Sequence, residues 1–538
     1  MHGSSQLFLS GFASKLHLKS GGHQLLTVTL ATVIWLCPLW LQPTAIVPSL
    51  LWAATGLGGL LILDTYIVPQ VANAKLQKTF IGLLVSLAAM AAWRSSNPQN
   101  ALAASLCLIS IGLAATLSAK AERTRPARLM AWGWLLAGIC NGVLGLIQYF
   151  GYTAEALGIA FGFLRQRNNF ATLCNIALIA LIYLWHQKQF SFPYGKWLAA
   201  ASGLLLAAAL AATTSRAGLL GLAAIAILTL TQKKLRKTAL FAILGYCLYA
   251  LVLPIVSGSG ESIFARVSHT IQNEQFQDSR TVMWHNTLAV ILQHPMLGVG
   301  WREIDRSLHL TDFGSAARFP GQVDNAHNLP LQFAAELGIP FTALWLLAFS
   351  WLVIRNKPWQ TRSPEVLLGW CVLLVIGIHS LLEYPLWYAP FQVATGMAAG
   401  LVFTQKNPLN NTSVSDTWRG LAGISLIVFS SYAAYDFNRV RQLFIPSSGR
   451  AGAESSWLFA AQVRYAKLST MTKTAGNAAE IYALAQEVFH FSAEPWVLKV
   501  MIESGEQLAT NNAKIAAEVA LFKRQLPAIL AADAPLIK

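Results

Sequence analysis

Polar and ionisable side chains stand at the ends of apolar segments in four short motifs of this sequence. Near a bilayer such groups cost roughly a few kcal/mol each, so their default interpretation is a functional site. A histidine accepts a proton readily near neutral pH, and an arginine binds phosphate oxygens at two points, so the motifs suit proton transfer and phosphate binding. The motifs are RQRNNFA (165–171), TTSRAG (213–218), NAHNLPLQ (325–332) and HSLLEYPLWY (379–388).

Each motif also has a purely structural interpretation. Arg216 is able to cap a helix end or to extend its stem toward lipid headgroups. His327 would serve equally well as an interfacial side chain bonded to a backbone carbonyl. Gln166 and Asn168 suit a helix start, and Tyr384 suits an aromatic belt next to a helix-breaking proline. The location of the motifs decides between the two interpretations, because residues with unrelated structural roles would not all lie on one face of the protein.

The composition indicates an integral membrane protein. Of 538 residues, 55% are hydrophobic and only 12% are charged, whereas a soluble protein carries roughly a quarter charged residues. The net charge of +16 is spread in short clusters between apolar runs, which is typical of topology signals and not of a nucleic-acid footprint. The six cysteines lie inside apolar runs without ligand spacing, so neither a disulfide framework nor a zinc site is expected.

The elements that must position the motifs are membrane-spanning helices. A span needs roughly 20 mostly apolar residues, and about 13 segments meet that criterion. The first follows Lys15 and Lys19 without a clear small-residue cleavage site, so we predict an uncleaved first span. The predicted spans are 25–41, 46–67, 79–93, 101–118, 129–150, 169–185, 197–213, 217–232, 238–256, 331–354, 365–382, 386–404 and 418–435.

The orientation of the spans follows from the basic residues in the short connections. With the N-terminus in the cytoplasm, the inside connections hold most of the lysines and arginines, as the positive-inside rule requires. The inside connections include Lys75, Lys78, Lys120, Arg123, Arg125, Arg128, Lys188, Lys196, the run KKLRK (233–237), Arg355, Lys357, Arg362, Lys406 and Arg419. The short outside connections hold only Arg94, Arg165, Arg167 and Arg216. All four polar motifs then fall on the outer face.

We therefore predict an all-α polytopic membrane protein with four segments. Two contain transmembrane helices, 1–256 and 326–437, and they are separated by a large periplasmic loop, 257–325. The fourth, 438–538, shows Ala-rich 3.6-residue periodicity typical of a small helical domain, without a clean tetratricopeptide-like repeat. The predicted location is a bacterial inner membrane, with the polar motifs facing the periplasm.

The order and spacing of the motifs resembles a known family. The set xQxNNxA, TxSRxG, WxxxLxxxxxHPxLGVGW, AHNxxLQxxAELGxP and HSxxEYPLWY is similar to that of the O-antigen ligase superfamily, and more narrowly to its PglL-type protein O-oligosaccharyltransferases. The resemblance covers about 130–405 and leaves the first spans and the tail unmatched. It implies a GT-C-type fold and transfer of a preassembled glycan from undecaprenyl pyrophosphate to an acceptor in the periplasm.

The resemblance also implies roles for particular residues. A serine or threonine hydroxyl needs a positioned base, and His327 fits that base. Fixed guanidiniums suit a dianionic leaving group. The implied donor-pyrophosphate residues are Arg216, Arg280 and Gln166, and the implied acceptor or glycan residues are Tyr384, with Tyr388 as a rival, Asn168 and Asn328.

No cofactor and no metal is expected, because the arginines stand where N-linked oligosaccharyltransferases use a metal with acidic ligands. Asp324 is either an orienting partner for the histidine or a lone metal ligand. The expected partners are the lipid-linked oligosaccharide, membrane lipids and a pilin-like protein acceptor, with no nucleic acid. Two other functions stay open: a ligase that attaches O-antigen to the lipid A core, and a lipid or glycan transporter, although transporters carry internal repeats and midplane charges. The tail of roughly 100 residues favours a protein acceptor.

Overall fold

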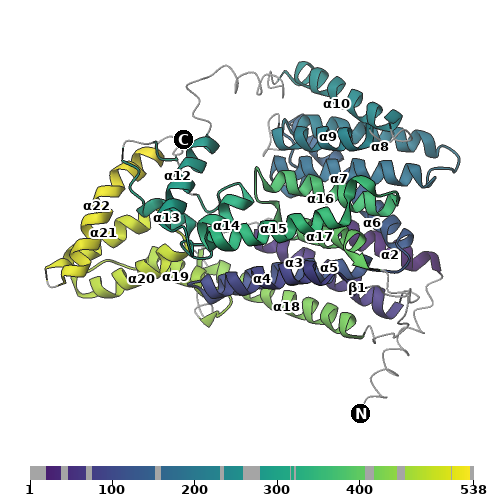
Figure 1. Cartoon of the computed structure of the whole chain (residues 1–538). Helices are drawn as coiled ribbons and strands as arrows, with labels where there is room; N and C mark the ends of the chain where they lie inside the picture. The colour runs from purple at the N-terminus through teal and green to yellow at the C-terminus, as the bar shows by residue number, and fades with distance from the viewer. Residues whose placement is uncertain are drawn as a thin grey trace, which may run out of the picture. The chain divides into compact units, whose positions relative to one another are not determined.

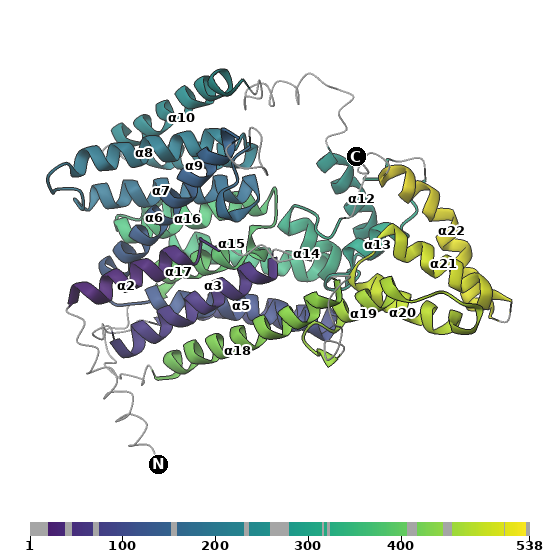
Figure 2. The same ribbon diagram turned by 180° about the vertical axis from the view of Figure 1, so that it is seen from behind.

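The protein folds into two compact units that interleave along the sequence, as seen in a computed structural model (Figures 1 and 2). Unit 1 comprises Met1–Leu84, Cys107–Gln272 and Phe349–Ser431, and unit 2 comprises Val85–Leu106, Asn273–Ala348 and Tyr432–Lys538. The structure describes residues 20–37, 46–67, 75–151, 159–230, 236–258, 279–314, 317–319, 323–405, 417–444, 455–510 and 512–533. The end of the first predicted span, 38–41, and residues 259–278 of the predicted loop lie outside this set.

Unit 1 consists almost entirely of apolar helices. They are α2 (Ser20–Val33), α3 (Ile46–Ile62) with the π-helical turn η1 (Leu63–Ile67), α6 (Thr124–Tyr149), α7 (Arg167–His186), α8 (Gly195–Ala212), α9 (Arg216–Leu230), α10 (Arg236–Ser257), α16 (Pro364–Ser380) and α17 (Ala389–Val402). Short 3-10 turns precede α7 and α17 and follow α15: η2 (Gly162–Leu164), η4 (Pro385–Trp387) and η3 (Pro358–Gln360). Four helices have residues in both units: α4 (Lys78–Arg94), α5 (Pro98–Ser118), α15 (Ile339–Asn356) and α18 (Thr417–Arg441).

The predicted class, an all-α multi-pass membrane protein, is confirmed. Among the described residues, eight helices are long and apolar enough to cross a membrane, and three apolar helices are shorter. The eight are Val47–Tyr66, Pro98–Ser118, Thr124–Tyr149, Arg167–His186, Gly195–Ala212, Arg236–Ser257, Ile339–Gln360 and Thr417–Phe444. The figure of about 13 spans and the GT-C assignment remain predictions.

Helix α7 forms the centre of unit 1, since every residue from Asn169 to Leu184 is buried. Small residues let neighbouring backbones approach it closely, which is the usual basis of helix packing in membranes. A Cβ on Gly218 of α9 would lie 2.6 Å from the Cβ of Ala171 in α7. The Asn175 side chain donates to the Gly218 carbonyl across the same contact, at 2.9 Å. The motif glycine therefore sets the spacing of α7 and α9.

Several connections predicted to face the cytoplasm meet at one end of unit 1. Asp64 in η1 accepts Lys120 at 2.8 Å and Arg419 at 3.1 Å, although these basic residues come from different connections. Strand β1 (Lys75–Leu76) pairs antiparallel with β2 (Thr404–Gln405). The alternation of inside and outside connections predicted from the basic residues is therefore consistent with the helix arrangement in this unit.

Unit 2 holds the described part of the large loop and the tail. The loop contributes α12 (Ser279–Gln293) and α13 (Ile304–Leu310), and α14 (Leu329–Leu337) follows directly after the loop. The tail contains α19 (Ala460–Thr470), α20 (Ala478–Phe491), α21 (Pro495–Ala509), α22 (Ala513–Asp533) and the short turns η5 (Gln442–Phe444) and η7 (Ala475–Asn477). The helical tail predicted from periodicity is thus observed. Its helices share a buried core that includes Phe489 and Val497.

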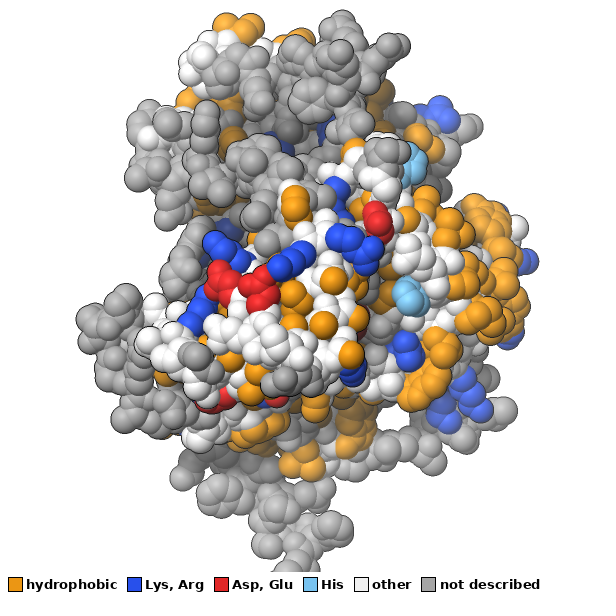
Figure 3. Space-filling model, turned by 90° about the vertical axis from the view of Figure 1, so that its left-hand side faces the viewer, with side chains coloured by type: hydrophobic (Ala, Val, Ile, Leu, Met, Phe, Trp, Pro, Cys, Tyr) orange, Lys and Arg blue, Asp and Glu red, His pale blue; other side chains and the backbone are white. Residues whose placement is uncertain are grey.

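The outer surface of the tail is charged with both signs. Acidic and basic side chains adjoin one another on the face that Figure 3 shows. The exposed ion pairs of the tail are Arg464–Glu487, Lys467–Glu480, Lys473–Glu503 and Lys523–Glu506. Exposed pairs contribute only about 0–1 kcal/mol each, so the apolar core, and not these pairs, holds the tail together.

Candidate functional site

Asn168 joins three of the four polar motifs within unit 1. Its amide nitrogen donates to the Glu383 carboxyl at 2.9 Å, and its amide oxygen accepts from the Ser215 hydroxyl at 2.6 Å. Asn168 belongs to the start of α7, Ser215 to the turn before α9, and Glu383 to the turn between α16 and α17. The Glu383 side chain is buried, with 7% of its residue surface exposed. Three segments far apart in sequence therefore share one polar centre, as their predicted common face requires.

The turn before α9 is built by its own hydroxyl groups. Ser215 accepts from the Gly218 amide at 3.0 Å and so caps the first turn of α9. Thr213 accepts from the Ser215 amide at 3.2 Å. Thr214 has a left-handed backbone with φ 48°. Arg216 follows directly as the first residue of α9 and is half-buried. The turn thus fixes the backbone that carries the predicted pyrophosphate-binding arginine.

The turn between α16 and α17 brings two tyrosines together. The rings of Tyr384 and Tyr388 stack with centroids 6.2 Å apart and an interplanar angle of 19°. Gln392 in α17 donates to the Leu386 carbonyl at 2.8 Å and braces the turn from within. Because the two rings stack on each other, both candidates for the predicted acceptor tyrosine lie in the same part of the turn.

Gln166 has a structural use that the sequence left open. Its side-chain oxygen accepts from the Asn169 amide at 2.6 Å, which makes Gln166 the N-cap of α7. Arg165 before it is left-handed, with φ 58°. The helix-start interpretation of Gln166 is therefore observed, and its donor-binding role remains a prediction.

His327 stands in unit 2 on a tightly held turn. Its backbone is left-handed, with φ 49°, and its amide donates to the Asn325 side chain at 2.8 Å. The neighbouring Ala326 is fully buried and bonded on both sides: its amide donates to Gln332 at 2.7 Å, and its carbonyl accepts from Trp284 at 3.0 Å. The His327 residue itself stays half-buried. A rigid turn thus presents the predicted base.

Helix α12 links the loop arginine to this turn. Arg280 is the second residue of α12, and Trp284, the donor to Ala326, lies four residues further on. Residues four apart lie on the same face of a helix. Asn328, the other predicted residue here, caps α14 by accepting from the Leu331 amide at 3.1 Å. Unit 2 therefore holds His327 and Asn328 on adjoining residues, and Arg280 on the helix whose Trp284 contacts their turn.

The motif HPMLGVGW wraps the C-terminal end of α14 and supplies the donors that its last carbonyls need. Val299 donates to Ala335 at 2.8 Å and Gly300 to Glu336 at 3.0 Å. Gly298 has φ 65°, and a Cβ there would lie 2.6 Å from the Ala335 carbonyl oxygen. Gly338 ends the helix, so the apolar segment predicted as one span over 331–354 is divided into α14 and α15.

Strained backbone is concentrated in these motifs. Among the described residues, seven that are not glycine have positive φ. Four of them lie in motifs or the loop beside them: Arg165, Thr214, Arg302 and His327. Such conformations cost about 1–3 kcal/mol each and persist where the surrounding structure enforces them, commonly at functional sites.

Glu336, next to the wrapped end of α14, is fully buried. Burial raises the pKa of this carboxyl from 4.5 to about 8, although the nearby Arg302 partly opposes the shift. A raised acid pKa means that the folded state holds a proton that the unfolded chain releases between about pH 4.5 and 8. The protein should therefore lose stability as pH rises through that window.

Glu336→Gln, which imitates the protonated carboxyl, is expected to remove this pH dependence. The variant should match the parent protein near pH 5 and unfold at a higher temperature near pH 9, by an amount that corresponds to roughly a few kcal/mol. The measurement is thermal unfolding in detergent across this pH range. Glu487→Gln in the exposed Arg464–Glu487 pair serves as the control and should leave the pH profile unchanged. If the unfolding temperatures of the parent and of Glu336→Gln fell equally between pH 5 and pH 9, a neutral Glu336 would be contradicted.

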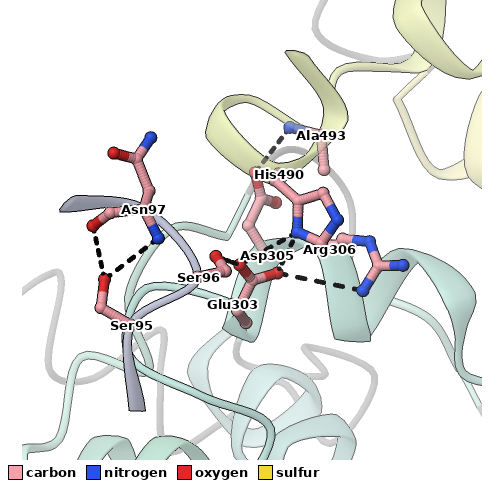
Figure 4. A network of polar contacts seen from close by, with 8 residues as sticks. All are labelled: Ser95, Ser96, Asn97, Glu303, Asp305, Arg306, His490 and Ala493. Atoms are coloured by element: carbon pink, nitrogen blue, oxygen red, sulfur yellow. Dashed lines mark hydrogen bonds and ion pairs between the residues drawn. The ribbon is translucent and has the colours of Figure 1, made fainter. Parts of the chain in front are cut away.

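A second polar network, absent from the sequence-based site, connects the loop with the tail (Figure 4). Both carboxylate oxygens of Glu303 lie 3.0 Å from the His490 Nδ1 of α20, and Glu303 also accepts from Ser96. Asp305 accepts from the Ala493 amide at 3.2 Å. The Glu303–His490 and Asp305–Ala493 contacts join residues almost 190 positions apart, so no local pattern could have revealed them. They hold α13 against the tail and lie outside the proposed chemistry.

The predicted residues thus form two groups. Unit 1 holds Arg216, Gln166, Asn168 and Tyr384, and unit 2 holds Arg280, His327 and Asn328. Asp324, the alternative orienting partner, is half-exposed and lies 4.0 Å from Arg302. Within the described residues, no group of three or more His, Cys, Asp or Glu side chains could hold a metal ion. Metal independence remains a prediction.

The architecture is that of a polytopic helical membrane protein with its polar motifs gathered at helix ends. The family described as "O-Antigen ligase" matches residues 201–346, and the family described as "Virulence factor membrane-bound polymerase, C-terminal" matches residues 367–518. Together with the two relatives described next, these matches support an O-antigen ligase-like, PglL-type protein.

Two relatives from Acinetobacter baylyi are similar to this chain. A general O-oligosaccharyltransferase is 25% identical over 352 residues, covering 60% of this chain and 60% of the relative. A ComP-specific O-oligosaccharyltransferase is 27% identical over 293 residues, covering 51% of this chain and 50% of the relative. The matches therefore span roughly half to three fifths of the relatives' lengths. The sequence-based recognition of the family is confirmed.

Proposed function

We propose that the protein is an oligosaccharyltransferase that moves a preassembled oligosaccharide from undecaprenyl pyrophosphate to a serine or threonine hydroxyl of a pilin-like protein. It acts at the periplasmic face of a bacterial inner membrane. The proposal is carried by the convergence of three family motifs on Asn168, beside Arg216. Its support from outside the structure is the similarity to two O-oligosaccharyltransferases.

The proposed reaction uses two kinds of group. His327 accepts the proton of the acceptor hydroxyl as its oxygen bonds to the anomeric carbon of the sugar. The bond between that carbon and the pyrophosphate oxygen breaks, and the pyrophosphate leaves with both electrons. Arg216 and Arg280 stabilise the negative charge that accumulates on the leaving group. The stacked tyrosines, Tyr384 and Tyr388, offer a flat aromatic surface to the acceptor or the glycan.

A second function uses the same chemistry with another acceptor. The match to the family described as "O-Antigen ligase" favours a ligase that attaches the glycan to the lipid A core. The helical tail, with its own apolar core, favours a protein acceptor instead, because it adds a folded surface beyond the membrane helices. The acceptor is the discriminating observation.

Co-expression with a lipid-linked oligosaccharide pathway and a candidate pilin tests the proposal. Intact mass should show the pilin increased by the mass of one oligosaccharide. Transfer to lipid A core in the same cells, with an unmodified pilin, would replace this function with that of the ligase. Neither product, with a protein that accumulates in the membrane and a demonstrated donor, would overturn both.

Arg216→Lys is expected to reduce transfer strongly in this assay. Lysine keeps the positive charge but loses the planar two-point contact with phosphate oxygens, and such a charge-stabilising donor contributes about 10²–10³-fold to the rate. The turn before α9 is held by Ser215 and Thr213, so the protein should still accumulate in the membrane. Arg236→Lys, at the exposed start of α10, is the matched control. Full transfer by Arg216→Lys would make Arg216 a helix-end residue only.

A further inference from the structure

An exposed apolar stripe runs from helix α12 into the turn that follows it. Its members are Leu288 and Leu292 on α12 and Met296 and Leu297 in the turn, with exposed fractions of 43%, 76%, 67% and 48%. The opposite face is buried, with Met283, Val290 and Ile291 packed against the segment that precedes His327. Leu288 and Leu292 follow at four-residue spacing, which places them along one side of the helix. Large contiguous exposed apolar surface marks a contact site and not ordinary protein surface.

The polarity of this side changes along the helix. Thr281 and His285, which precede the apolar stripe on the same side, are exposed and polar. The apolar part begins only with Leu288. A helix with a polar beginning and an apolar end suits a boundary between water and lipid, where each part meets its own solvent.

The apolar stripe continues directly into a helix that is long and apolar enough to cross a membrane. The Ile339 amide, at the start of α15, donates to the Pro295 carbonyl at 2.8 Å. Gly338 is packed so closely on Met296 that a Cβ would overlap the Met296 carbonyl. Further along α15, Leu344 and Leu347 are 69% and 66% exposed, as expected of side chains that face lipid. Two apolar surfaces, one on the loop and one on α15, are therefore joined directly through this contact.

An arginine and a tryptophan mark the same junction. Arg94, the last residue of α4, donates to the carbonyls of Leu297 and Gly298, at 3.2 Å each. Its guanidinium lies 5.6 Å from the ring centroid of Trp93, which is 64% exposed. Tryptophan and arginine are typical of the headgroup region, where an apolar ring and a charged end both find partners.

We infer that the apolar stripe of α12 lies in the acyl-chain region of the bilayer, in the leaflet that contains the start of α15. The occupant of this surface is phospholipid. Through Trp284, which donates to the Ala326 carbonyl, α12 then holds the His327 turn at a fixed depth near the membrane surface. Only this last consequence rests on the proposed function, because a lipid-linked donor presents its pyrophosphate at that depth. The lipid contact itself does not.

Photo-crosslinking in a bilayer tests the inference without reference to activity. p-Benzoylphenylalanine replaces Leu292 in the full chain, reconstituted in nanodiscs of phosphatidylethanolamine and phosphatidylglycerol. After irradiation, intact mass should show an addition equal to one phospholipid. The matched control carries the same group at His285, seven residues earlier on the same exposed side, and should give several-fold less lipid adduct. A second probe at Met296 should repeat the result for Leu292.

Three outcomes would overturn the inference. Equal lipid adducts at positions 292 and 285 would mean that the apolar stripe has no preference for the bilayer. A crosslinked dimer would assign the surface to a second copy of the chain. A crosslink within one chain would assign it to another segment of the same protein. The lipid adducts and the dimer are read from the mass of the intact protein. A crosslink within one chain leaves that mass unchanged and is read from the joined peptides of a digest. Loss of the proposed transferase activity would imitate none of these results.

Discussion

Replacement of His327 is expected to lower glycan transfer by about 10²–10⁴-fold, the usual contribution of a positioned general base. His327→Asn is the sharper variant, because the turn requires φ 49° and asparagine adopts left-handed backbone more readily than most residues. Asparagine donates and accepts hydrogen bonds but cannot take up the proton of the acceptor hydroxyl. The turn itself should survive, because Trp284 and Gln332 hold the neighbouring Ala326.

Transfer and donor binding must be measured separately in the purified protein. A short-chain analogue of the lipid-linked donor should bind His327→Asn as it binds the parent, because the proposed contacts of the pyrophosphate are arginines. His285→Asn, exposed on α12, is the control and should keep full transfer. Wild-type transfer by His327→Asn would make this histidine an interfacial bystander. Loss of donor binding would move it to the donor site.

The grouping of the polar motifs could be predicted because it follows from a simple rule. Apolar segments of span length alternate in direction, and basic residues mark every second connection. Motifs at the same parity of connection must therefore share an end, and Asn168, Ser215 and Glu383 do so in unit 1. The rule predicts at which end of the helix bundle a motif lies, but it does not predict which side chain contacts which.

The individual contacts could not be predicted for the same reason. The sequence indicates only a helix-breaking proline close to Glu383, and the fold shows that the Glu383 carboxyl accepts from Asn168. The Glu303–His490 contact joins a loop to the tail across sequence that carries no shared periodicity. The break at Gly338 was missed because AELGIP continues an apolar segment, and the reason for the break is the wrapping of another segment around the end of α14.

Two side-chain amides of the motifs have both a predicted functional role and an observed structural role. Gln166 and Asn328 were assigned to donor and glycan binding, and each side chain is used as an N-cap by the helix that follows it. An N-cap stabilises a helix by about 1 kcal/mol, which is sufficient reason for an amide at that position. Asn168 differs, because its side chain bonds to two other segments. Its position therefore depends on the assembled site.

Exchange of the two partners, Asn168 and Glu383, is therefore expected to separate geometry from chemistry. In the parent protein, the Asn168 amide nitrogen donates to the Glu383 carboxyl at 2.9 Å. In Asn168→Asp alone, a second carboxyl replaces this donor. A buried acceptor that loses its donor costs about 1–3 kcal/mol, and the repulsion of the two acids adds to this. We expect reduced thermal stability and loss of transfer, because the same side chain positions Ser215 in the turn that carries Arg216.

The double variant Asn168→Asp/Glu383→Gln restores the contact in reverse. The new amide at position 383 would donate to the new carboxylate at position 168. That carboxylate would still accept from the Ser215 hydroxyl, so every hydrogen bond of the network has a donor and an acceptor. Thermal stability should return toward that of the parent, with a favourable coupling energy in the double-mutant cycle.

If transfer returns as well, Glu383 serves to position the three motifs. If stability returns and transfer does not, the carboxyl of Glu383 itself takes part in the reaction. A double variant no more stable than Asn168→Asp alone would contradict the contact on which the site is built.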